Sequence, residues 1–536
     1  MSNAVTFEAD VAIVGSGVGG ALIAEGLARS GLKVLVLEAG VRFTRDEILS
    51  RQRSIWQQDN SSLYPDTDLA PRASPSSVNR YEIVNHGPIE FGSYYLRGVG
   101  GTTWHWQAVC LRMSLSDQRI RTQYGVGYDW PLAYSEMQHY YDVAEIELGV
   151  SGDNRSPFGK HRENSFPMAA VAPSYADILI QNEMSGSGIE FFSRPTARNS
   201  QPYDGRPACQ GHHNCSNMCP IGAQYAAIVH VEKAEKHGAR FLSEALVTEL
   251  KTDGDSKIAS LYGKRADGSR FSVKAKAYVI AANPVESVRL MLGSASSEYP
   301  QGIGNSSGAV GRRLMDHYNI GWRMDAARPV YAGRGPLTAF ATDALLDGDF
   351  RKHQASSLVG FENIDLTSEV ATEALRKFPL DAPAVDAEIR RLLSRRLVLT
   401  ASIEQLPVDE NRIWVDFAKR DKNGLPQINA HYSLGAYSQA GRSASRKLFD
   451  QIATRLNAKM VSEGAPFYAV HTSGTLMMGD DPSSFVCDPY GRTHDHENLF
   501  VAGSSLFPSI SAVNPTLTIA ALALRTKDRI KQTLRA

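Results

Sequence analysis

The sequence predicts an α/β protein in which a parallel sheet flanked by helices forms one domain and an α+β arrangement on an antiparallel sheet forms another. Three observations support this prediction. A glycine-rich strand–turn–helix pattern opens the chain, a second such pattern closes it at residues 497–527, and partly alternating apolar runs fill residues 396–432. A chain of 536 residues is also too long for one simple core.

Composition and charge exclude several classes of function. The chain carries 57 basic and 57 acidic side chains, so its net charge gives no reason to expect nucleic-acid binding. No apolar run is long enough to cross a bilayer, and the N-terminal stretch MSNAVTFEADVAIVG lacks the basic and apolar regions of a signal peptide. The five cysteines are too few for a disulfide framework. We therefore expect a globular enzyme that is cytoplasmic unless a partner exports it.

Residues 10–40 have the pattern of a βαβ unit. An apolar strand is expected over residues 11–14 and another over residues 34–37, with a helix between them that ends near Gly31. The turn before the helix carries G-x-G-x-x-G, formed by Gly15, Gly17 and Gly20. Because strand, turn, helix and second strand all fall at the required offsets, the unit is predicted to bind a dinucleotide.

Each residue of this fingerprint has a physical task. Gly15 makes the tight turn, Gly17 lets a pyrophosphate approach the backbone, and Gly20 lets the helix pack closely on the strand. The free N–H groups at the start of the helix face the phosphates. Glu38, at the end of the second strand, can accept hydrogen bonds from both ribose hydroxyls. By itself the pattern does not separate FAD from NAD.

Three of the five cysteines stand in CQGHHNCSNMCP, with the spacing C-x5-C-x3-C-P. Thiolates followed by proline and near glycines suit an iron–sulfur loop, and the three ligands Cys209, Cys215 and Cys219 would leave one corner of a cubane open, as in a [3Fe–4S] cluster. A structural zinc that adds His212 or His213 is the alternative. The spacing alone leaves both hypotheses open. The remaining cysteines, Cys110 and Cys487, are expected to be packing residues.

Five further segments resemble the glucose–methanol–choline (GMC) oxidoreductases, and they occur in the family's order. They are RGVGGTTWHW (97–106), AKAYVIAANPVESVRLML (275–292), VGRRLMDH (310–317), HTSGTLMMG (471–479) and ENLFVAGSSLFPSISAVNPTLTIAALALRTK (497–527). The resemblance implies that the dinucleotide is FAD and that the C-terminal segment closes the flavin site.

Within that family, residues 197–225 resemble the catalytic subunits of bacterial membrane-bound FAD sugar dehydrogenases of the glucose, fructose and 2-ketogluconate type. The resemblance favours a [3Fe–4S] cluster over zinc. It also implies a sugar or sugar-acid substrate, a small exported subunit and a multihaem c-type cytochrome as partners. Association with these partners would place the chain on the periplasmic side of the inner membrane.

The resemblance also assigns catalytic residues. A base must take the hydroxyl proton while hydride leaves the carbon for N5 of FAD, and a neutral imidazole suits this task. His471 matches the family's base. Asn514 matches the second active-site position, where its amide would bond the reacting oxygen. Because Asn514 precedes Pro515 and a helical pattern, it is also a good N-cap, so both interpretations stay open.

Further residues are expected to hold the flavin. His105 stands where some family members bond the flavin covalently; the alternative is an imidazole stacked between Trp104 and Trp106. Besides the residues of the first fingerprint, the predicted cofactor-binding set comprises Gly100, Gly101, Thr102, His105, Val247, Gly503, Ser504, Asn514 and Thr516.

The distribution of the motifs predicts a discontinuous FAD-binding Rossmann-like domain of residues 1–155, 205–325 and 463–536. The substrate domain is then 156–204 and 326–462, with a solvated helical pair over 366–396 and a turn at Asn423-Gly424 between strands. The tripeptide HDH (494–496) is predicted to be a solvated turn rather than a metal site.

Together these patterns predict an FAD-dependent dehydrogenase that oxidises a sugar hydroxyl and passes electrons through the cluster to a cytochrome c. Three alternatives remain: an alcohol or sugar oxidase or dehydrogenase of the same family with structural zinc instead of the cluster, an NAD-dependent reductase with zinc, and a non-enzymatic flavin–iron electron carrier. The sequence does not identify the sugar.

Overall fold

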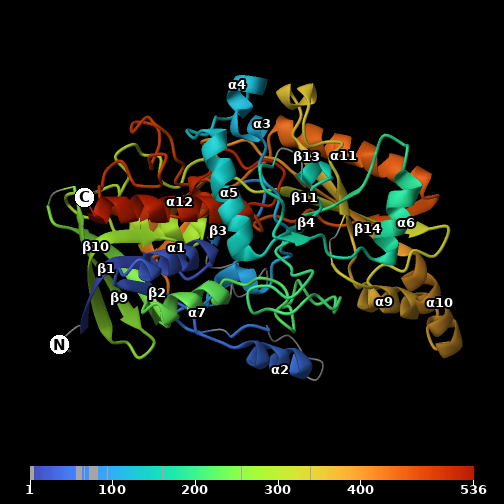
Figure 1. The fold of residues 1–536 in the computed structure, drawn as a ribbon, viewed down its shortest axis with the longest axis horizontal. Helices are drawn as coiled ribbons and strands as arrows, with labels where there is room; N and C mark the ends of the chain where they lie inside the picture. The colour runs from blue at the N-terminus through green and yellow to red at the C-terminus, as the bar shows by residue number, and fades with distance from the viewer. Residues whose placement is uncertain are drawn as a thin grey trace.

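The computed structural model describes residues 5–55, 63–65, 67–71, 83–92, 94–159, 162–254, 256–337 and 340–535. Figure 1 shows a wide molecule in which the strands that begin the chain lie at one end and the helices α9 (Thr367–Lys377) and α10 (Ala382–Arg395) at the other. The chain returns repeatedly to the first end, so that the C-terminal helix lies beside the N-terminal helix (Figure 1).

A seven-stranded sheet forms the first layer. Its order is β7 (Arg240–Leu242), β2 (Val34–Leu37), β1 (Val5–Val14), β10 (Arg270–Ile280), β9 (Ile258–Arg265) and β8 (Ala245–Thr252), and β18 (Leu499–Val501) also pairs with β10. The pairs around β1, β2 and β10 are parallel, except that β9 adds antiparallel to β10 and β8 to β9. The predicted strands at residues 11–14 and 34–37 are therefore both present, side by side.

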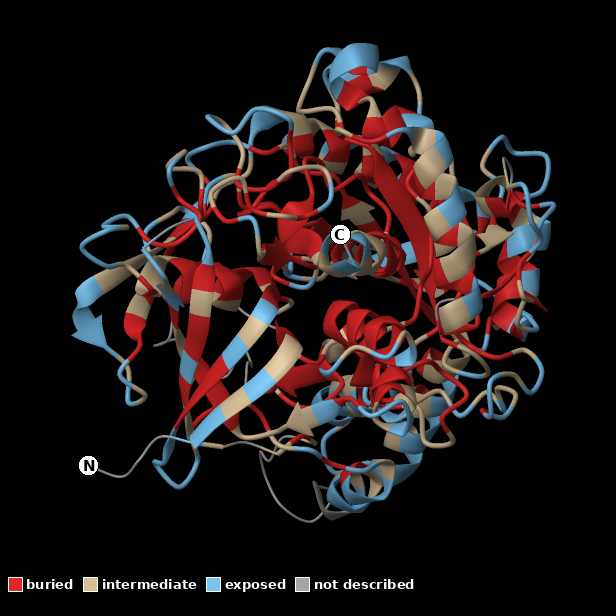
Figure 2. Cartoon of the chain, turned by 60° about the vertical axis from the view of Figure 1, so that its left-hand side comes forward, coloured by how far each residue is buried: buried red, intermediate tan, exposed pale blue. Residues whose placement is uncertain are grey.

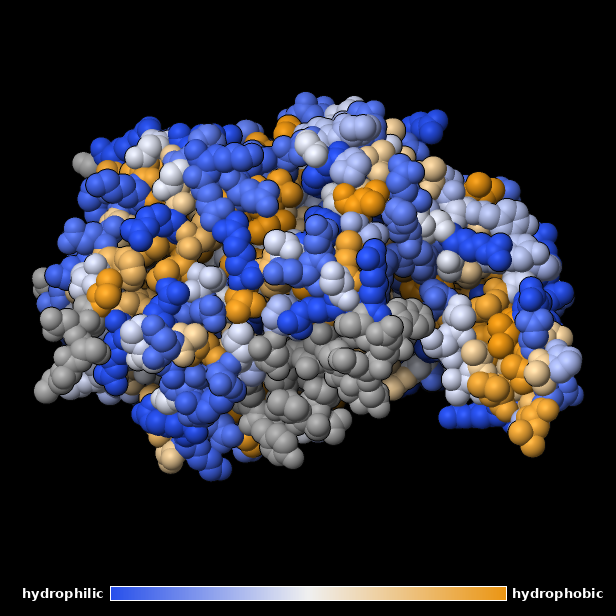
Figure 3. Space-filling model, turned by 90° about the horizontal axis from the view of Figure 1, so that it is seen from below, coloured by the Kyte–Doolittle hydropathy of each residue, from blue (hydrophilic) through white to orange (hydrophobic). Residues whose placement is uncertain are grey.

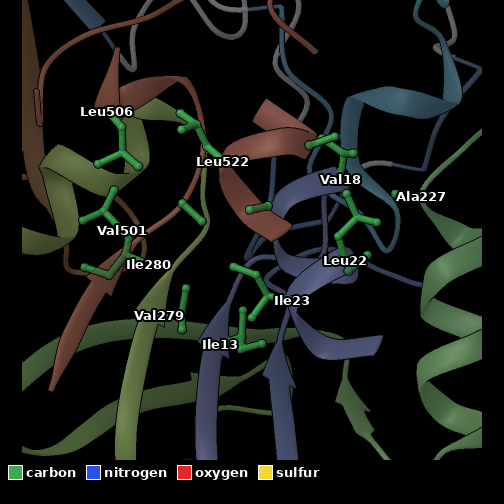
Figure 4. Packing of buried hydrophobic residues seen from close by; sticks show 14 of the residues in the cluster. Ile13, Val18, Leu22, Ile23, Ala227, Val279, Ile280, Val501, Leu506 and Leu522 are labelled. Atoms are coloured by element: carbon green, nitrogen blue, oxygen red, sulfur yellow. The ribbon is translucent and has the colours of Figure 1, made fainter. Parts of the chain in front are cut away.

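Helices cover this sheet because the apolar residues of its strands need partners on both faces. α1 (Val18–Arg29) contacts both α7 (Ile228–Lys236) and α12 (Thr516–Arg535), and α12 also contacts α5 (Tyr134–Leu148). Figure 4 shows Ile13 of β1 next to Ile23 of α1, in the same cluster as Val279 of β10 and Leu522 of α12. These four side chains are at most 2 % exposed, and burial of an aliphatic side chain stabilises the fold by about 1.5–3 kcal/mol.

The second sheet has six strands. Its order is β17 (Ala458–Glu463), β11 (Tyr318–Ala326), β14 (Arg396–Ile403), β13 (Ser357–Glu362), β12 (Phe340–Thr342) and β6 (Phe192–Ser193), and all pairs are antiparallel. α11 (Ala436–Arg455) packs on it, with Phe449 against Trp322 of β11 in a second apolar core. The predicted α/β class with an antiparallel second domain is confirmed.

Smaller elements complete the fold. β15 (Arg412–Arg420) and β16 (Pro426–His431) form a hairpin through the predicted Asn423-Gly424 turn and add β3 (Ile83–Asn85). The runs at 396–432 thus divide between two sheets. The remaining elements are α2 (Arg45–Ile55), α3 (Leu115–Gln118), α4 (Ile120–Tyr124), α6 (Tyr175–Met184), α8 (Pro284–Gly293), β4 (Ser151–Gly152), β5 (Met168–Ala169), and the 3-10 helices Gly101–Trp104, Pro157–Gly159, Asp349–Lys352 and Ser504–Leu506.

The predicted domain boundaries stay a prediction, and two strands lie across them. β11 begins at Tyr318 and β17 ends at Glu463, so both extend past the predicted limits of the substrate domain, although they are strands of the six-stranded sheet. β11 pairs with β14 on one side and with β17 on the other, so it is an inner strand of the six-stranded sheet.

Two local predictions, the helical pair over 366–396 and the HDH turn, have different outcomes. The helical pair is confirmed as α9 (Thr367–Lys377) and α10 (Ala382–Arg395); Leu380, between them, is fully exposed, and Figure 3 shows apolar side chains gathered at the right-hand end, where Figure 1 places these helices. The prediction of a solvated HDH turn is wrong for His496. That ring is fully buried against Tyr299, and its Nε2 accepts the Gly304 N–H at 3.3 Å.

Both isolated cysteines, Cys110 and Cys487, are buried as expected. Figure 2 shows buried residues concentrated in the two sheets and in the helices that lie against them.

Among the described residues, no helix combines the length and the hydropathy that a membrane span requires.

Candidate active site

A large cavity lies where the parallel strands β1, β2 and β10 end, which is where open α/β sheets bind ligands. It encloses about 1700 Å³ of empty space, its open mouth included. Segments from both ends and the middle of the chain meet around it: residues 14–19, 37–39, 94–97, 101–103, 245–247, 281–284, 469–472, 502–504 and 515–516. The fold therefore gathers motifs that are hundreds of residues apart in the sequence.

The first glycine turn is shaped by close contacts. Gly15 has a φ of +101°, and a Cβ there would lie 2.6 Å from the Ala281 oxygen; a Cβ at Gly20 would lie 2.1 Å from the Gly15 oxygen. At Gly17 a Cβ would meet nothing within 4 Å. Gly17 thus leaves open space next to the start of α1, where the free N–H groups favour a pyrophosphate. The cavity therefore fits a dinucleotide.

Glu38 is held at the end of β2 by the glycine turn. Its Oε2 accepts the Ser16 N–H at 3.1 Å and the Ser16 hydroxyl at 2.7 Å, and its Oε1 accepts the Gly40 N–H at 3.0 Å. The Ser16 hydroxyl oxygen also accepts the Gly100 N–H at 3.2 Å, which ties the second glycine-rich segment to the first. Sequence analysis missed Ser16; a hydroxyl inside the G-x-G turn was the available signal.

Two histidines meet at one side of the cavity. Nδ1 of His471 lies 2.8 Å from Nδ1 of His317, and the Asp316 carboxylate accepts both backbone N–H groups, from His471 at 3.0 Å and from His317 at 2.7 Å. His471 lines the cavity, and burial lowers its pKa to about 4. The imidazole is therefore neutral near pH 7 and can accept a proton.

Asn514 turns its side chain toward this pair. Its Nδ2 lies 3.3 Å from Nε2 of His471, so of the two interpretations the geometry favours the active-site position over the N-cap. α12 begins two residues later, at Thr516, and the cavity is lined by Thr516 and Ile519 of its first turn and by Pro515 just before it. The positive end of the helix dipole is thus directed at the cavity.

Comparisons with known proteins agree with this geometry. A profile described as GMC oxidoreductase matches residues 407–523. The fructose dehydrogenase large subunit of Gluconobacter japonicus is 37% identical over 546 aligned residues, which cover 100% of both chains. The chain belongs to the GMC oxidoreductase family. It is an FAD-dependent oxidoreductase that acts on CH–OH donors.

Two more distant similarities support the same family and fold. The gluconate 2-dehydrogenase flavoprotein of Pantoea cypripedii is 23% identical to this GMC oxidoreductase, with 98% of this chain and 93% of that protein covered. A formate oxidase variant from Aspergillus oryzae superimposes with a TM-score of 0.67 over 99% of each chain at 15% identity. The second similarity concerns the fold alone.

Most of the predicted FAD residues of this GMC oxidoreductase line the cavity. They are Gly15, Gly17, Glu38, Gly101, Thr102, Val247, Gly503, Ser504 and Thr516. Gly20 and Gly100 instead act behind the lining, through close packing under Gly15 and the hydrogen bond to Ser16. Asn514 reaches the cavity only through His471.

His105 lies outside this set, because it is not among the described residues that line the cavity, whereas its neighbour Trp106 is. Its ring packs at 5.5 Å from the ring of Tyr64, and burial lowers its pKa to about 4. The half-buried ring is therefore neutral. The covalent link of FAD to His105 stays a prediction.

Asp316 and His317 were missed as site residues. Both belong to the VGRRLMDH segment, which the sequence analysis noted without assigning a role. The position of an Asp-His pair directly before β11 was the only signal, and pairing of Met315 with Ser473 is what brings it to His471. A contact across more than 150 residues has no local pattern in the sequence.

The three cysteines of residues 209–220 line one small cavity, together with Arg198, His212 and His213. The Gly211 N–H donates to Sγ of Cys209 at 3.4 Å, a bond that is typical of iron–sulfur loops. The three thiol groups are donors of the kind that would hold a three-thiolate cluster. Within the described part of the chain, however, no group of three or more His, Cys, Asp or Glu side chains is gathered as a metal site.

The loop is tied to the FAD cavity. The Gln224 side-chain amide donates to the carbonyl of Trp106 at 2.7 Å and to that of Cys215 at 3.3 Å. Trp106 lines the large cavity and Cys215 lines the small one, so the Gln224 side chain bridges the two sites. His213 bonds the Asn363 carbonyl through Nε2, and this uses one of its two ring nitrogens.

Proposed function

We propose that this protein is a dehydrogenase that oxidises a hydroxyl group of a sugar or sugar acid. The observation that supports this most is the full-length similarity to a fructose dehydrogenase large subunit, together with the neutral His471 at the cavity. The gluconate 2-dehydrogenase flavoprotein is a second relative named for a sugar-acid substrate.

His471 is the proposed base. Its Nε2 points toward Asn514, so the hydroxyl of a bound substrate would bond both side chains, with the proton passing to Nε2 and the amide of Asn514 holding the oxygen. When bound, FAD supplies the hydride acceptor. Burial keeps His471 neutral and ready for the proton, and the N-terminus of α12 supplies a positive field at the cavity.

We further propose that Cys209, Cys215 and Cys219 hold a [3Fe–4S] cluster, whose chemistry is transfer of single electrons to a c-type cytochrome partner. The common cavity, the N–H donor to a sulfur and the Gln224 bridge to the FAD cavity support this. Zinc would satisfy part of the same donor set but has no redox chemistry.

A multisubunit assembly follows from this proposal. The relative from Gluconobacter japonicus is named a large subunit, and for this chain we propose a small exported subunit and a multihaem cytochrome, with the complex on the periplasmic side of the inner membrane. Co-expression with the neighbouring genes, followed by fractionation and haem staining, tests this part; a chain that stays alone in the cytoplasm would contradict it.

One set of experiments tests the function. Purified holoenzyme is mixed without oxygen with fructose, glucose, gluconate and 2-ketogluconate, and flavin absorbance is followed; bleaching by at least one of them is expected, and no bleaching by any polyol would contradict the proposal. Iron and zinc are counted in the same sample, and the Cys215→Ser variant is expected to lose iron. Fast reoxidation by oxygen without iron would instead indicate an oxidase.

A further inference from the structure

We propose that His317 is a positioning residue that holds His471 in the tautomer with its proton on Nδ1 and its lone pair on Nε2. This inference rests on the proposed role of His471 as the base. The groups that surround the ring of His317 determine where its protons lie.

The first step fixes the protons of His317. Its Nε2 lies 2.9 Å from the Ser511 carbonyl oxygen. A carbonyl oxygen only accepts hydrogen bonds, so Nε2 carries a proton. The side chain is 0 % exposed, and burial, followed by the neighbouring His471, lowers the pKa of His317 well below its ordinary value. A neutral imidazole has one N–H, so Nδ1 of His317 is bare.

The tautomer of His317 determines the tautomer of His471. Two nitrogens 2.8 Å apart need one proton between them, and because Nδ1 of His317 is bare, Nδ1 of His471 is the donor. Burial keeps His471 neutral as well, so its Nε2 has the lone pair. The Asn514 amide nitrogen, 3.3 Å from that Nε2, is a donor and fits this assignment.

The third step concerns how the pair is held. Asp316 accepts the backbone N–H of both histidines and so fixes the two backbones at one point. The rings meet edge to face, with their centroids 4.8 Å apart. The acceptor behind the base is therefore a neutral imidazole and not a carboxylate, which orients the base without raising its pKa. Wrong tautomers of such bases are costly to catalysis.

Three variants separate this role from a structural one. In His317→Asn the amide oxygen takes the place of Nδ1 and still accepts from His471, whereas His317→Gln places its amide near the Ser511 carbonyl and lacks an acceptor at the Nδ1 position. His317→Phe has neither group. We expect the maximal rate of flavin reduction to fall about 10²-fold or more in the Gln and Phe variants and to stay within about tenfold of wild type in the Asn variant.

Substrate affinity should be unchanged in all three variants, because His317 is not among the described residues that line the cavity, so the loss appears in kcat and not in KM. A Gln variant as fast as the Asn variant would overturn the proposal, since it would make the Ser511 contact the important one. FAD content and melting temperature are measured for each. A His471→Ala variant with normal flavin reduction would instead refute the proposed base, whatever His317 does.

A second measurement needs no variant of His317. Nitrogen-15 NMR of histidine-labelled wild-type holoenzyme distinguishes protonated from bare ring nitrogens, and a His471→Gln sample identifies the signals that belong to His471. We expect a protonated Nδ1 and a bare Nε2. A protonated Nε2 in wild type would overturn the proposal even if every variant failed to fold.

Discussion

The pH dependence of flavin reduction tests the electrostatics of the site. Burial shifts the pKa of His471 from 6.5 to about 4, which is a differential cost of about 3 kcal/mol for the charged form. At pH 5.5 about 97% of such a histidine is still neutral, compared with about a tenth of an ordinary one. The maximal rate of anaerobic flavin reduction should therefore change little between pH 7.5 and 5.5 and should fall only as the pH approaches 4.

Stopped-flow mixing at saturating substrate measures this rate directly. Asp316 needs a control, because burial raises its pKa to about 7 and it lies in the same pH window. Asp316→Asn keeps an oxygen for the two backbone N–H groups and cannot titrate. If the Asp316→Asn variant loses about nine tenths of its rate between pH 7.5 and 5.5, His471 has an ordinary pKa and the reasoning from burial is refuted.

Three further predictions follow from the same contacts. Gly17→Ala should fold with a normal melting temperature but lose FAD, because its Cβ enters open space beside the pyrophosphate position. Gly20→Ala should instead be destabilised, because its Cβ would contact a backbone oxygen. Thermal melts and FAD content after gel filtration distinguish the two variants, and equal effects would contradict the assignment. Burial raises the folded-state pKa of Asp316, so its contribution to the free energy of unfolding is present at low pH and is lost as pH rises through about 7. Asp316→Asn should therefore raise the melting temperature more at pH 8 than at pH 5, and a reversed order would contradict this. If FAD is bonded to His105, acid should precipitate yellow protein from wild type and colourless protein from His105→Ala; yellow supernatant from wild type would remove the link.

The sequence was most informative where a function depends on backbone shape. The glycine turn, β2 and Glu38 follow each other within one βαβ unit, so their geometry is local and its residue pattern is strict. The C-terminal strand and helix are likewise one local unit, present as β18 and α12. These parts of the fold and of the cavity could be predicted.

Contacts between distant segments could not be predicted in the same way. His317 reaches His471 only because Met315 and Ser473 pair. Neither a methionine nor a serine in the sequence indicates that such a pairing forms. The burial of His496 depends on Tyr299, almost 200 residues earlier in the chain. The strand pairing that places β11 between β14 and β17 has no counterpart in a linear pattern, so the order of these strands could not be predicted from the sequence.

The central claim is that His471 takes the proton from a sugar hydroxyl as the flavin is reduced. It is tested most directly by anaerobic reduction of the flavin in wild type and His471→Gln, with the sugar that bleaches wild type fastest and with FAD content matched. We expect the variant to bind the sugar but to be reduced about 10²–10⁴ times more slowly. A variant reduced within a few-fold of the wild-type rate would contradict it.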